Sequence, residues 1–207
     1  MSKIKLKHSS GNSMSIGAPA TNPASDLELK LPATVGSAGQ VVKNSGTAGT
    51  LEYGYATEVD QWRLTTNFQG AVEPLANNLE RNDNNFTKIG DGMSVSSGYW
   101  TFPSTGIWRI EFVRDGYVNG NDREFRVLIY RSTDGSNYAA LTENASNIRD
   151  FNTNGHGQVV SQAIFDVTNT STHKVYFRCL GDNANTYTIG RTSENQTYMT
   201  FTRLGDT

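Results

Sequence analysis

The sequence predicts an all-β fold, and three observations carry that prediction. Apolar and polar residues alternate over many short segments, with the period of two that is typical of strands burying one face. Aromatic residues, which favour pleated sheets, are frequent, with nine Tyr, nine Phe and three Trp. Stretches rich in Gly, Asn, Asp and Ser separate the alternating segments and are typical of turns. Many short strands at this spacing indicate a β-sandwich or barrel.

The clearest alternation lies in residues 100–113, WTFPSTGIWRIEFV. Trp108, Ile110 and Phe112 point to one face, and the charged residues between them point to the other. The preceding Pro103-Ser104-Thr105-Gly106 continues neither a helix nor a ladder, because proline lacks an N–H donor and glycine has a permissive backbone. The segment is therefore predicted to be strand, corner and strand.

The same pattern predicts a head domain over residues 57–207. A hairpin is expected at Thr133-Asp134-Gly135-Ser136, and one helical turn at Leu75–Glu80. The expected strands are Gln61–Thr66, Lys88–Ile89, Tyr99–Phe102, Ile107–Arg114, Glu124–Arg131, Tyr138–Leu141, Gln158–Thr168, Lys174–Leu180, Tyr187–Arg191 and Gln196–Leu204.

Residues 1–56 differ from the head, because they are poor in aromatic residues and rich in Gly, Ala, Ser and Thr. Only two short pieces alternate, Lys3–Lys7 (KIKLK) and Asp26–Leu31 (DLELKL), and such short apolar rows cannot support an independent domain. We expect this segment to be an extended stalk or anchor held by neighbouring chains. Its candidate anchoring side chains are Ile4, Leu6, Leu27, Leu29 and Leu31.

Charge and cysteine content exclude several classes of protein. The formal net charge is −2, so no broad cationic field is present to bind nucleic acid. The single Cys179 cannot form an intrachain disulfide, which indicates folding in a reducing cytoplasm. No apolar run approaches the roughly 18 residues of a membrane span, so membrane insertion is not expected.

The segment Arg123–Arg131, REFRVLIYR, is apolar on both faces. Phe125, Val127 and Ile129 occupy one face, while Leu128 and Tyr130 occupy the other. A sandwich strand has only one face toward its own core, so the second apolar row must meet something else. Either another copy of the chain or a loop folding over the strand would cover it. We favour another copy, with Leu128 and Tyr130 at a trimer interface.

The spacing Trp100-x5-Gly106-x-Trp108-x-Ile110-x-Phe112 resembles the signature of the globular head of the first complement component. That family shares the tumour necrosis factor jelly roll. The closing Tyr198-Met199-Thr200-Phe201 is similar to the family's last strand, although Thr200 stands where the family has glycine. The resemblance implies a jelly-roll head that packs as a homotrimer about a threefold axis, above an N-terminal stalk or fibre.

A second resemblance covers residues 31–54, LPATVGSAGQVVKNSGTAGTLEYG. This run is similar to linkers that precede terminal domains in bacteriophage fibre and appendage proteins. The resemblance implies a virion protein, assembled in the host cytoplasm, that joins other virion proteins through residues 1–56.

No catalytic constellation and no cofactor motif is recognisable. His8, His156 and His173 are too dispersed for a local ligand cluster. Gly90-Asp91-Gly92 and Gly181-Asp182-Asn183 offer oxygens that suit calcium, but they lack the regular acidic spacing of a calcium loop, and we interpret them as turns. The sequence therefore predicts neither an enzyme nor a metal site.

Recognition is expected in loops, because a rigid sandwich presents them with free side chains. Residues 115–122 (DGYVNGND) and 144–156 carry aromatic, amide and charged groups that suit a host glycan or protein. The candidate receptor-binding residues are Tyr117, Asn119, Asn121, Asn154 and His156.

The predicted function is a non-enzymatic, homotrimeric bacteriophage fibre or appendage whose head contacts the host surface. One alternative is a capsid decoration protein that stabilises the shell without binding a receptor. The other is a polysaccharide depolymerase, which would require paired carboxyl groups roughly 5–10 Å apart in a cleft.

Overall fold

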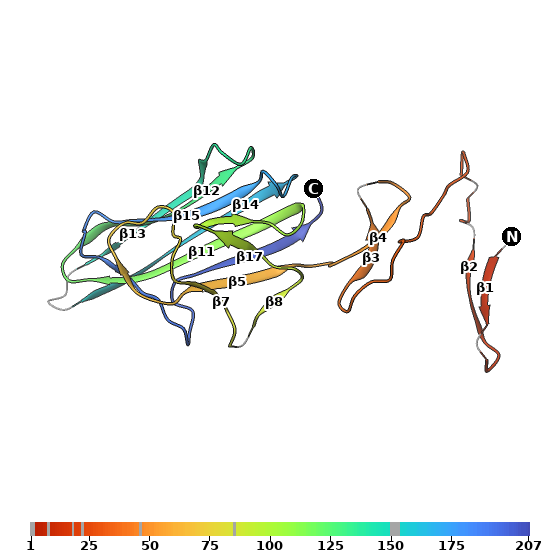
Figure 1. The fold of residues 1–207 in the computed structure, drawn as a ribbon, viewed down its shortest axis with the longest axis horizontal. Coiled ribbons are helices and arrows are strands. Elements are labelled where there is room, and N and C mark those ends of the chain that lie inside the picture. The colour runs from red at the N-terminus through yellow and green to blue at the C-terminus, as the bar shows by residue number, and fades with distance from the viewer. Residues whose placement is uncertain are drawn as a thin grey trace. The chain divides into compact units, whose positions relative to one another are not determined.

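The structure is a computed structural model that describes residues 3–7, 9–17, 19–21, 23–45, 47–84, 86–149 and 154–207 (Figure 1). The chain divides into two compact units, residues 1–54 and residues 55–207, and the second forms the head. All regular secondary structure in the described ranges is β-strand, which confirms the predicted all-β class.

One layer of the head is an antiparallel sheet of five strands. Their order across the sheet is β13-β12-β15-β10-β9. The members are β9 (Ser94–Ser96), β10 (Tyr99–Thr101), β12 (Asp122–Ser132), β13 (Ala139–Ile148) and β15 (Lys174–Leu180).

The other layer is a sheet of eight strands built around the long strand β11. Strand β14 pairs with one edge of β11, and β16 and β17 pair with the other edge. Beyond β17 lies β5, which pairs with β7 and β8, and β6 pairs with β16. The members are β5 (Val59–Leu64), β6 (Phe68–Gln69), β7 (Leu79–Arg81), β8 (Lys88–Ile89), β11 (Gly106–Val118), β14 (Gly155–Val167), β16 (Tyr187–Thr188) and β17 (Tyr198–Gly205).

The core is an aromatic layer between the two sheets. Trp100 of β10 packs against Phe201 of β17, with ring centroids 5.0 Å apart, and Phe112 of β11 packs 4.9 Å from Phe177 of β15. All four side chains are buried, as the alternation along β11 and β15 predicts. The head is therefore a closed sandwich, and the side chains that alternate with these core residues point outward from each sheet.

The corner at residues 103–106 carries the chain from one sheet to the other. Strand β10 belongs to the five-stranded sheet, and β11 belongs to the eight-stranded sheet. Gly106 begins β11 with φ of 143°, and a Cβ there would lie 2.5 Å from the carbonyl oxygen of Gly205. Only glycine fits this crossing, which explains why the predicted strand, corner and strand pattern holds.

In the described residues of the N-terminal unit, the regular structure consists of two hairpins and one further bridge. Strands β1 (Lys3–Lys7) and β2 (Ser13–Gly17) pair with each other, as do β3 (Val41–Asn44) and β4 (Leu51–Gly54). Lys30 forms an isolated parallel bridge with Thr50.

Most predicted strands are confirmed, one predicted helical turn is wrong, and one alternating segment forms no strand. Leu75–Glu80 forms no helical turn, because the backbone N–H of the buried Leu75 donates to the carbonyl of Phe177 and β7 starts at Leu79. Asp26–Leu31 forms no strand, because only Lys30 finds a bridge partner. In both places, pairing with distant residues overrides the local pattern.

None of the described residues belongs to a helix of the length and apolar character that crossing a membrane requires.

Candidate recognition and assembly surfaces

Leu128 and Tyr130 lie on the outward face of the five-stranded sheet, where their own chain buries Leu128 and covers part of Tyr130. Leu128 is only 4% exposed in the single chain. The ring of Tyr130 stacks on the ring of Tyr176, with centroids 4.7 Å apart and planes 6° apart, and its hydroxyl accepts a hydrogen bond from Arg178. The chain itself therefore covers Leu128 and part of Tyr130, so the apolar character of this row does not by itself require a partner copy. The role of these two residues in a trimer stays an untested prediction.

The predicted recognition loops are largely strands. Residues 115–118 complete β11, residues 144–148 complete β13, and residues 155–156 begin β14. The long antiparallel ladder between β11 and β14 extends to Val118 and Gly155 and draws these residues into the sheet. Tyr117 and His156 are therefore fixed strand residues rather than residues of mobile loops.

The structure nevertheless brings Tyr117 and His156 together. They are partners in register, and their ring centroids are 5.6 Å apart. Tyr187 of β16 stacks on the other side of Tyr117, with centroids 4.9 Å apart and planes 7° apart. Sequence analysis missed Tyr187, whose only signal was its place in a predicted strand. The three rings form a row across one end of the eight-stranded sheet.

The predicted asparagines lie at the same end of the head. Asn119 follows β11 directly and Asn154 precedes β14 directly, so both continue beyond the Val118–Gly155 pair. Asn121 lies in the same β11–β12 turn, and its carbonyl accepts a hydrogen bond from the Asn183 side chain. Their roles in receptor binding stay predictions.

The outward face of the eight-stranded sheet carries exposed apolar side chains. Val160 and Ile164 of β14 are 45% and 54% exposed. Val113 of β11 lies in register between Val160 and Tyr198 of β17, so apolar side chains adjoin across three strands, although Val113 itself is buried. On the outward face of the five-stranded sheet, by contrast, Leu128 is buried, while Tyr99 is 36% exposed.

A polar row follows beside that apolar row. The side-chain amide of Gln162 donates to Glu111 over 3.0 Å, and that of Gln61 donates to the Thr200 hydroxyl over 3.0 Å. Arg109 forms an ion pair with Glu111 at 3.2 Å. This face thus presents apolar side chains next to positively charged, negatively charged and uncharged polar side chains.

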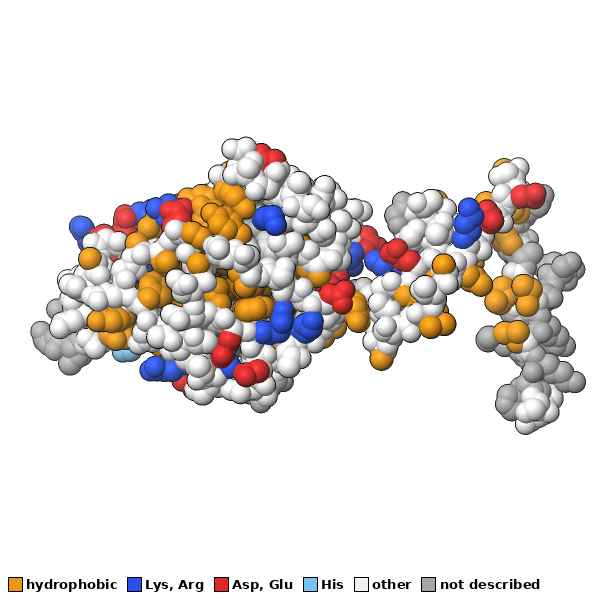
Figure 2. All heavy atoms as spheres, viewed as in Figure 1, with side chains coloured by type: hydrophobic (Ala, Val, Ile, Leu, Met, Phe, Trp, Pro, Cys, Tyr) orange, Lys and Arg blue, Asp and Glu red, His pale blue; other side chains and the backbone are white. Residues whose placement is uncertain are grey.

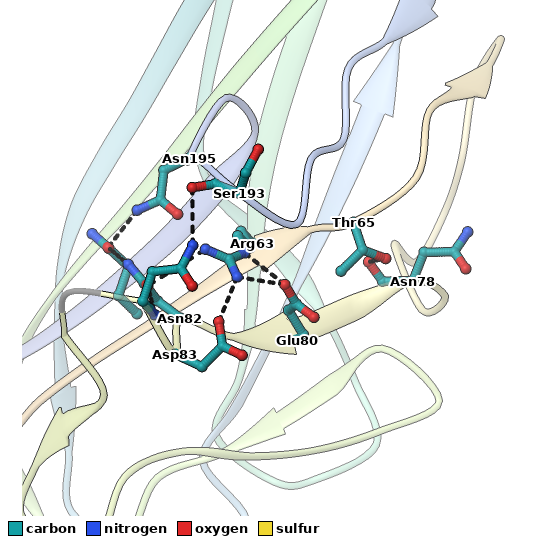
Figure 3. A network of polar contacts seen from close by, with 10 residues as sticks. Arg63, Thr65, Asn78, Glu80, Asn82, Asp83, Ser193 and Asn195 are labelled. Carbon is teal, nitrogen blue, oxygen red and sulfur yellow. Dashed lines mark hydrogen bonds and ion pairs between the residues drawn. The ribbon is translucent and has the colours of Figure 1, made fainter.

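A buried arginine, Arg63, lies on β5 of the same sheet (Figure 3). The Arg63 guanidinium lies between two carboxylates, 2.7 Å from Glu80 and 2.6 Å from Asp83. A buried cation requires such partners, because desolvation without them is costly. The side-chain amides of Asn82 and Asn195 both donate to the side-chain oxygen Oε1 of Gln61, over 3.0 and 2.6 Å. The network holds β5, β7 and the segment before β17 rigidly together.

The apolar anchor candidates of the N-terminal unit are exposed, as the surface in Figure 2 illustrates for that unit. Leu27 and Leu31 are 76% and 75% exposed, and Leu29, Ile4 and Leu6 are also more than half exposed. None of these five side chains contributes to a core within its own chain, so apolar area is left for a contact with another molecule.

Two titratable groups of the head, Arg114 and Cys179, are buried. Arg114 is fully buried between the sheets, where its guanidinium lies 3.9 Å from the centre of the Phe125 ring and donates to Thr188 and to the carbonyls of Arg126 and Leu180. Burial lowers the pKa of Arg114 and raises the pKa of the Cys179 thiol to about 11. No group of three or more His, Cys, Asp or Glu residues that could hold a metal ion occurs in the part of the chain that the structure describes; His8 lies outside it.

Comparison with known proteins identifies the fold. No protein-family model and no curated protein matches the sequence. Eiger TNF from S. frugiperda matches with a TM-score of 0.54 and 9% identity, over 72% of this chain and 93% of that chain. Murine APRIL at pH 5.0 matches with a TM-score of 0.48 and 10% identity, over 72% of this chain and 99% of that chain. The head is a tumour necrosis factor-like jelly roll. This result confirms the predicted jelly-roll fold.

Proposed function

We propose that this protein is a non-enzymatic structural component of a bacteriophage particle. It forms a homotrimeric fibre or appendage, attaches to other virion proteins through its N-terminal unit, and contacts the host surface with its jelly-roll head. The observation that carries the proposal is the contrast between the two units. The head buries its own core, while the N-terminal unit leaves five apolar anchor side chains exposed.

The exposed face of the eight-stranded sheet supports a homotrimer. Val160 and Ile164 remain about half exposed in a single chain, next to the Arg109–Glu111 ion pair. A surface that has an apolar row beside one positive and one negative side chain can pair with a second copy of itself. A partner that carried charge of a single sign would instead repel either Arg109 or Glu111. We therefore place the contact between copies on this face and not at Leu128 and Tyr130. The trimeric state itself follows the resemblance to the complement head.

The bacteriophage context is supported by the resemblance of residues 31–54 to the linkers of phage fibres. The experiment that tests it is the production of particles with either the full chain or a chain that lacks residues 1–54. The full chain should be located on purified particles by immuno-electron microscopy. The shortened chain should remain folded, with an unchanged melting temperature, and should be absent from particles. Incorporation of the shortened chain would refute the anchoring role.

Host contact is tested on the same particles. Particles that lack the head should adsorb more slowly to host cells and should keep their resistance to heat. Normal adsorption together with loss of heat resistance would refute host contact and favour a decoration protein.

A further inference from the structure

A cluster of four tyrosines lies on the outward face of the five-stranded sheet. Tyr176 of β15 is at its centre, and its ring centroid lies 4.7 Å from that of Tyr130, 5.6 Å from that of Tyr99 and 5.2 Å from that of Tyr138. Tyr99 and Tyr138 also contact each other at 5.2 Å. Tyr99, Tyr176 and the hairpin that carries Tyr130 and Tyr138 are far apart in the sequence, so the fold brings these rings together.

A pocket of about 390 Å³ opens beside the two more peripheral rings. Its volume lies within the roughly 300–1,000 Å³ of small-molecule sites. Tyr99 is 36% exposed, so part of its ring is available to a ligand. The lining residues are Ser96, Tyr99, Thr101, Gly135, Tyr138 and Lys174.

Polar contacts fix the ring of Tyr176, which packs against both Tyr99 and Tyr138. The Tyr176 hydroxyl donates to a Glu73 carboxylate oxygen over 2.8 Å, and the other oxygen of that carboxylate forms an ion pair with Arg178 at 2.9 Å. Burial and this hydrogen bond raise the pKa of Tyr176, which keeps the phenol protonated. Rings that are fixed before binding lose little conformational entropy when a ligand arrives.

Lys174 supplies a cation at the pocket. Its ammonium donates to the Thr101 hydroxyl over 2.9 Å. An ammonium has three N–H donors, so two remain for a ligand. Across the residues that the structure describes, no carboxylate lies within ion-pair distance of Lys174. Asp134, which acts electrostatically on Tyr138, is hydrogen-bonded to Ser132 and Asn137 instead.

We propose that this pocket binds an acidic saccharide, a sugar ring that carries a carboxylate. The C–H faces of a pyranose are apolar and its rim is polar, which matches an exposed tyrosine face beside hydroxyl groups. Tyr99 and Tyr138 contact the sugar face, Lys174 binds the carboxylate, and Ser96 and Thr101 contact ring hydroxyls. The inference deepens host contact and rests on the proposed function for its biological role. The pocket lies on the sheet opposite the proposed trimer face, so assembly leaves it open.

The test is a titration of the full-length protein, labelled on its tyrosine rings, with glucuronate and, separately, with glucose, observed by NMR. Glucuronate should shift the Tyr99 and Tyr138 resonances saturably, and about two- to fivefold more tightly than glucose, because of Lys174. Tyr138→Ala should weaken glucuronate binding about two- to tenfold. Ser96→Trp should abolish it by filling the pocket, and Lys174→Met should remove the preference over glucose.

The matched control is Tyr117→Ala, which removes a stacked ring from the other sheet and should leave the titration unchanged. The inference is overturned if glucuronate gives no saturable shift, if the shifts fall on Tyr117 and Tyr187, or if folded Lys174→Met keeps the full preference for glucuronate. Adsorption separates this outcome from the proposed function. Particles that adsorb through the head without any saccharide shift would overturn only the pocket, and saccharide binding without adsorption would overturn only host contact.

Discussion

Replacing Val160 and Ile164 together by aspartate should separate the proposed trimer into monomers. Both side chains are about half exposed in the single chain, at 45% and 54%. Full burial of a Val or Ile side chain contributes about 1.5–3 kcal/mol, so burial of the remaining half at an interface contributes about 0.7–1.5 kcal/mol for each residue. With two such residues in each of three copies, the apolar contribution is about 4–9 kcal/mol per trimer.

The double variant loses this contribution and brings two carboxylates per chain into the contact. The association constant should therefore fall by at least about a thousandfold, because every 1.4 kcal/mol is a factor of ten. Light scattering after gel filtration, at micromolar protein, should give three times the chain mass for the wild type and one chain mass for the variant. The melting temperature measured for the head reports whether the variant still folds.

Ala145→Asp is the control, because it introduces an aspartate at an exposed strand position of the other sheet. This variant should remain trimeric. A monomeric wild type, or a double variant that stays trimeric, would show that copies do not pack through the eight-stranded sheet. Dissociation of the Ala145→Asp variant would place the contact on the five-stranded sheet instead.

Three further predictions concern the head itself. Arg114→Met should lower the free energy of unfolding in urea by about 3 kcal/mol, because buried acceptors lose their donor. The same substitution at the exposed Arg109 should lower it by less than about 1 kcal/mol. Equal losses of stability in the two variants would contradict this prediction. Cys179, whose pKa burial raises to about 11, should react with a thiol reagent at pH 8 only as fast as the protein unfolds, and complete labelling of the native head within a minute would contradict this. Hydrogen bonds from the Asn137 side chain and from backbone amides lower the pKa of Asp134, so its contribution to stability is present above the unfolded value of about 3.9 and is lost as the pH falls through the folded value. The difference in melting temperature between wild type and Asp134→Ala should accordingly be present at pH 6 and shrink toward pH 2, and a constant difference would contradict it.

The strands of the head could be predicted because each buries one face. Lys174–Leu180 was predicted to the residue, since Val175, Phe177 and Cys179 alternate with outward side chains and all three are buried. The alternation also fixes which side chains point outward. Tyr99 and Tyr176 flank buried aromatic residues in sequence, so their outward direction was readable, although the cluster that they form was not.

Elements that depend on distant partners could not be predicted. Residues 115–118 and 155–156 look like loop residues, because Gly, Asn and His separate their apolar neighbours. In the structure they lie at the end of the antiparallel ladder between β11 and β14, whose more apolar part sets the register. Extending this ladder adds backbone hydrogen bonds, but no alternation of apolar and polar residues in these segments indicates the extension. Asp26–Leu31 shows the opposite case, where good alternation forms no strand because the described part of the unit offers only Thr50 for pairing.

The doubly apolar strand β12 shows what such a pattern can establish. Apolar residues on both faces require that both faces be covered, but they do not identify the cover. Here Tyr176 and its neighbours provide much of it from within the chain, because three other segments of the head place rings on the same face. A surface for self-association is better found from the area that remains exposed after the chain has folded. By that criterion the proposed contact between copies lies at Val160 and Ile164, on the opposite sheet, and the tyrosine face is left available for a ligand.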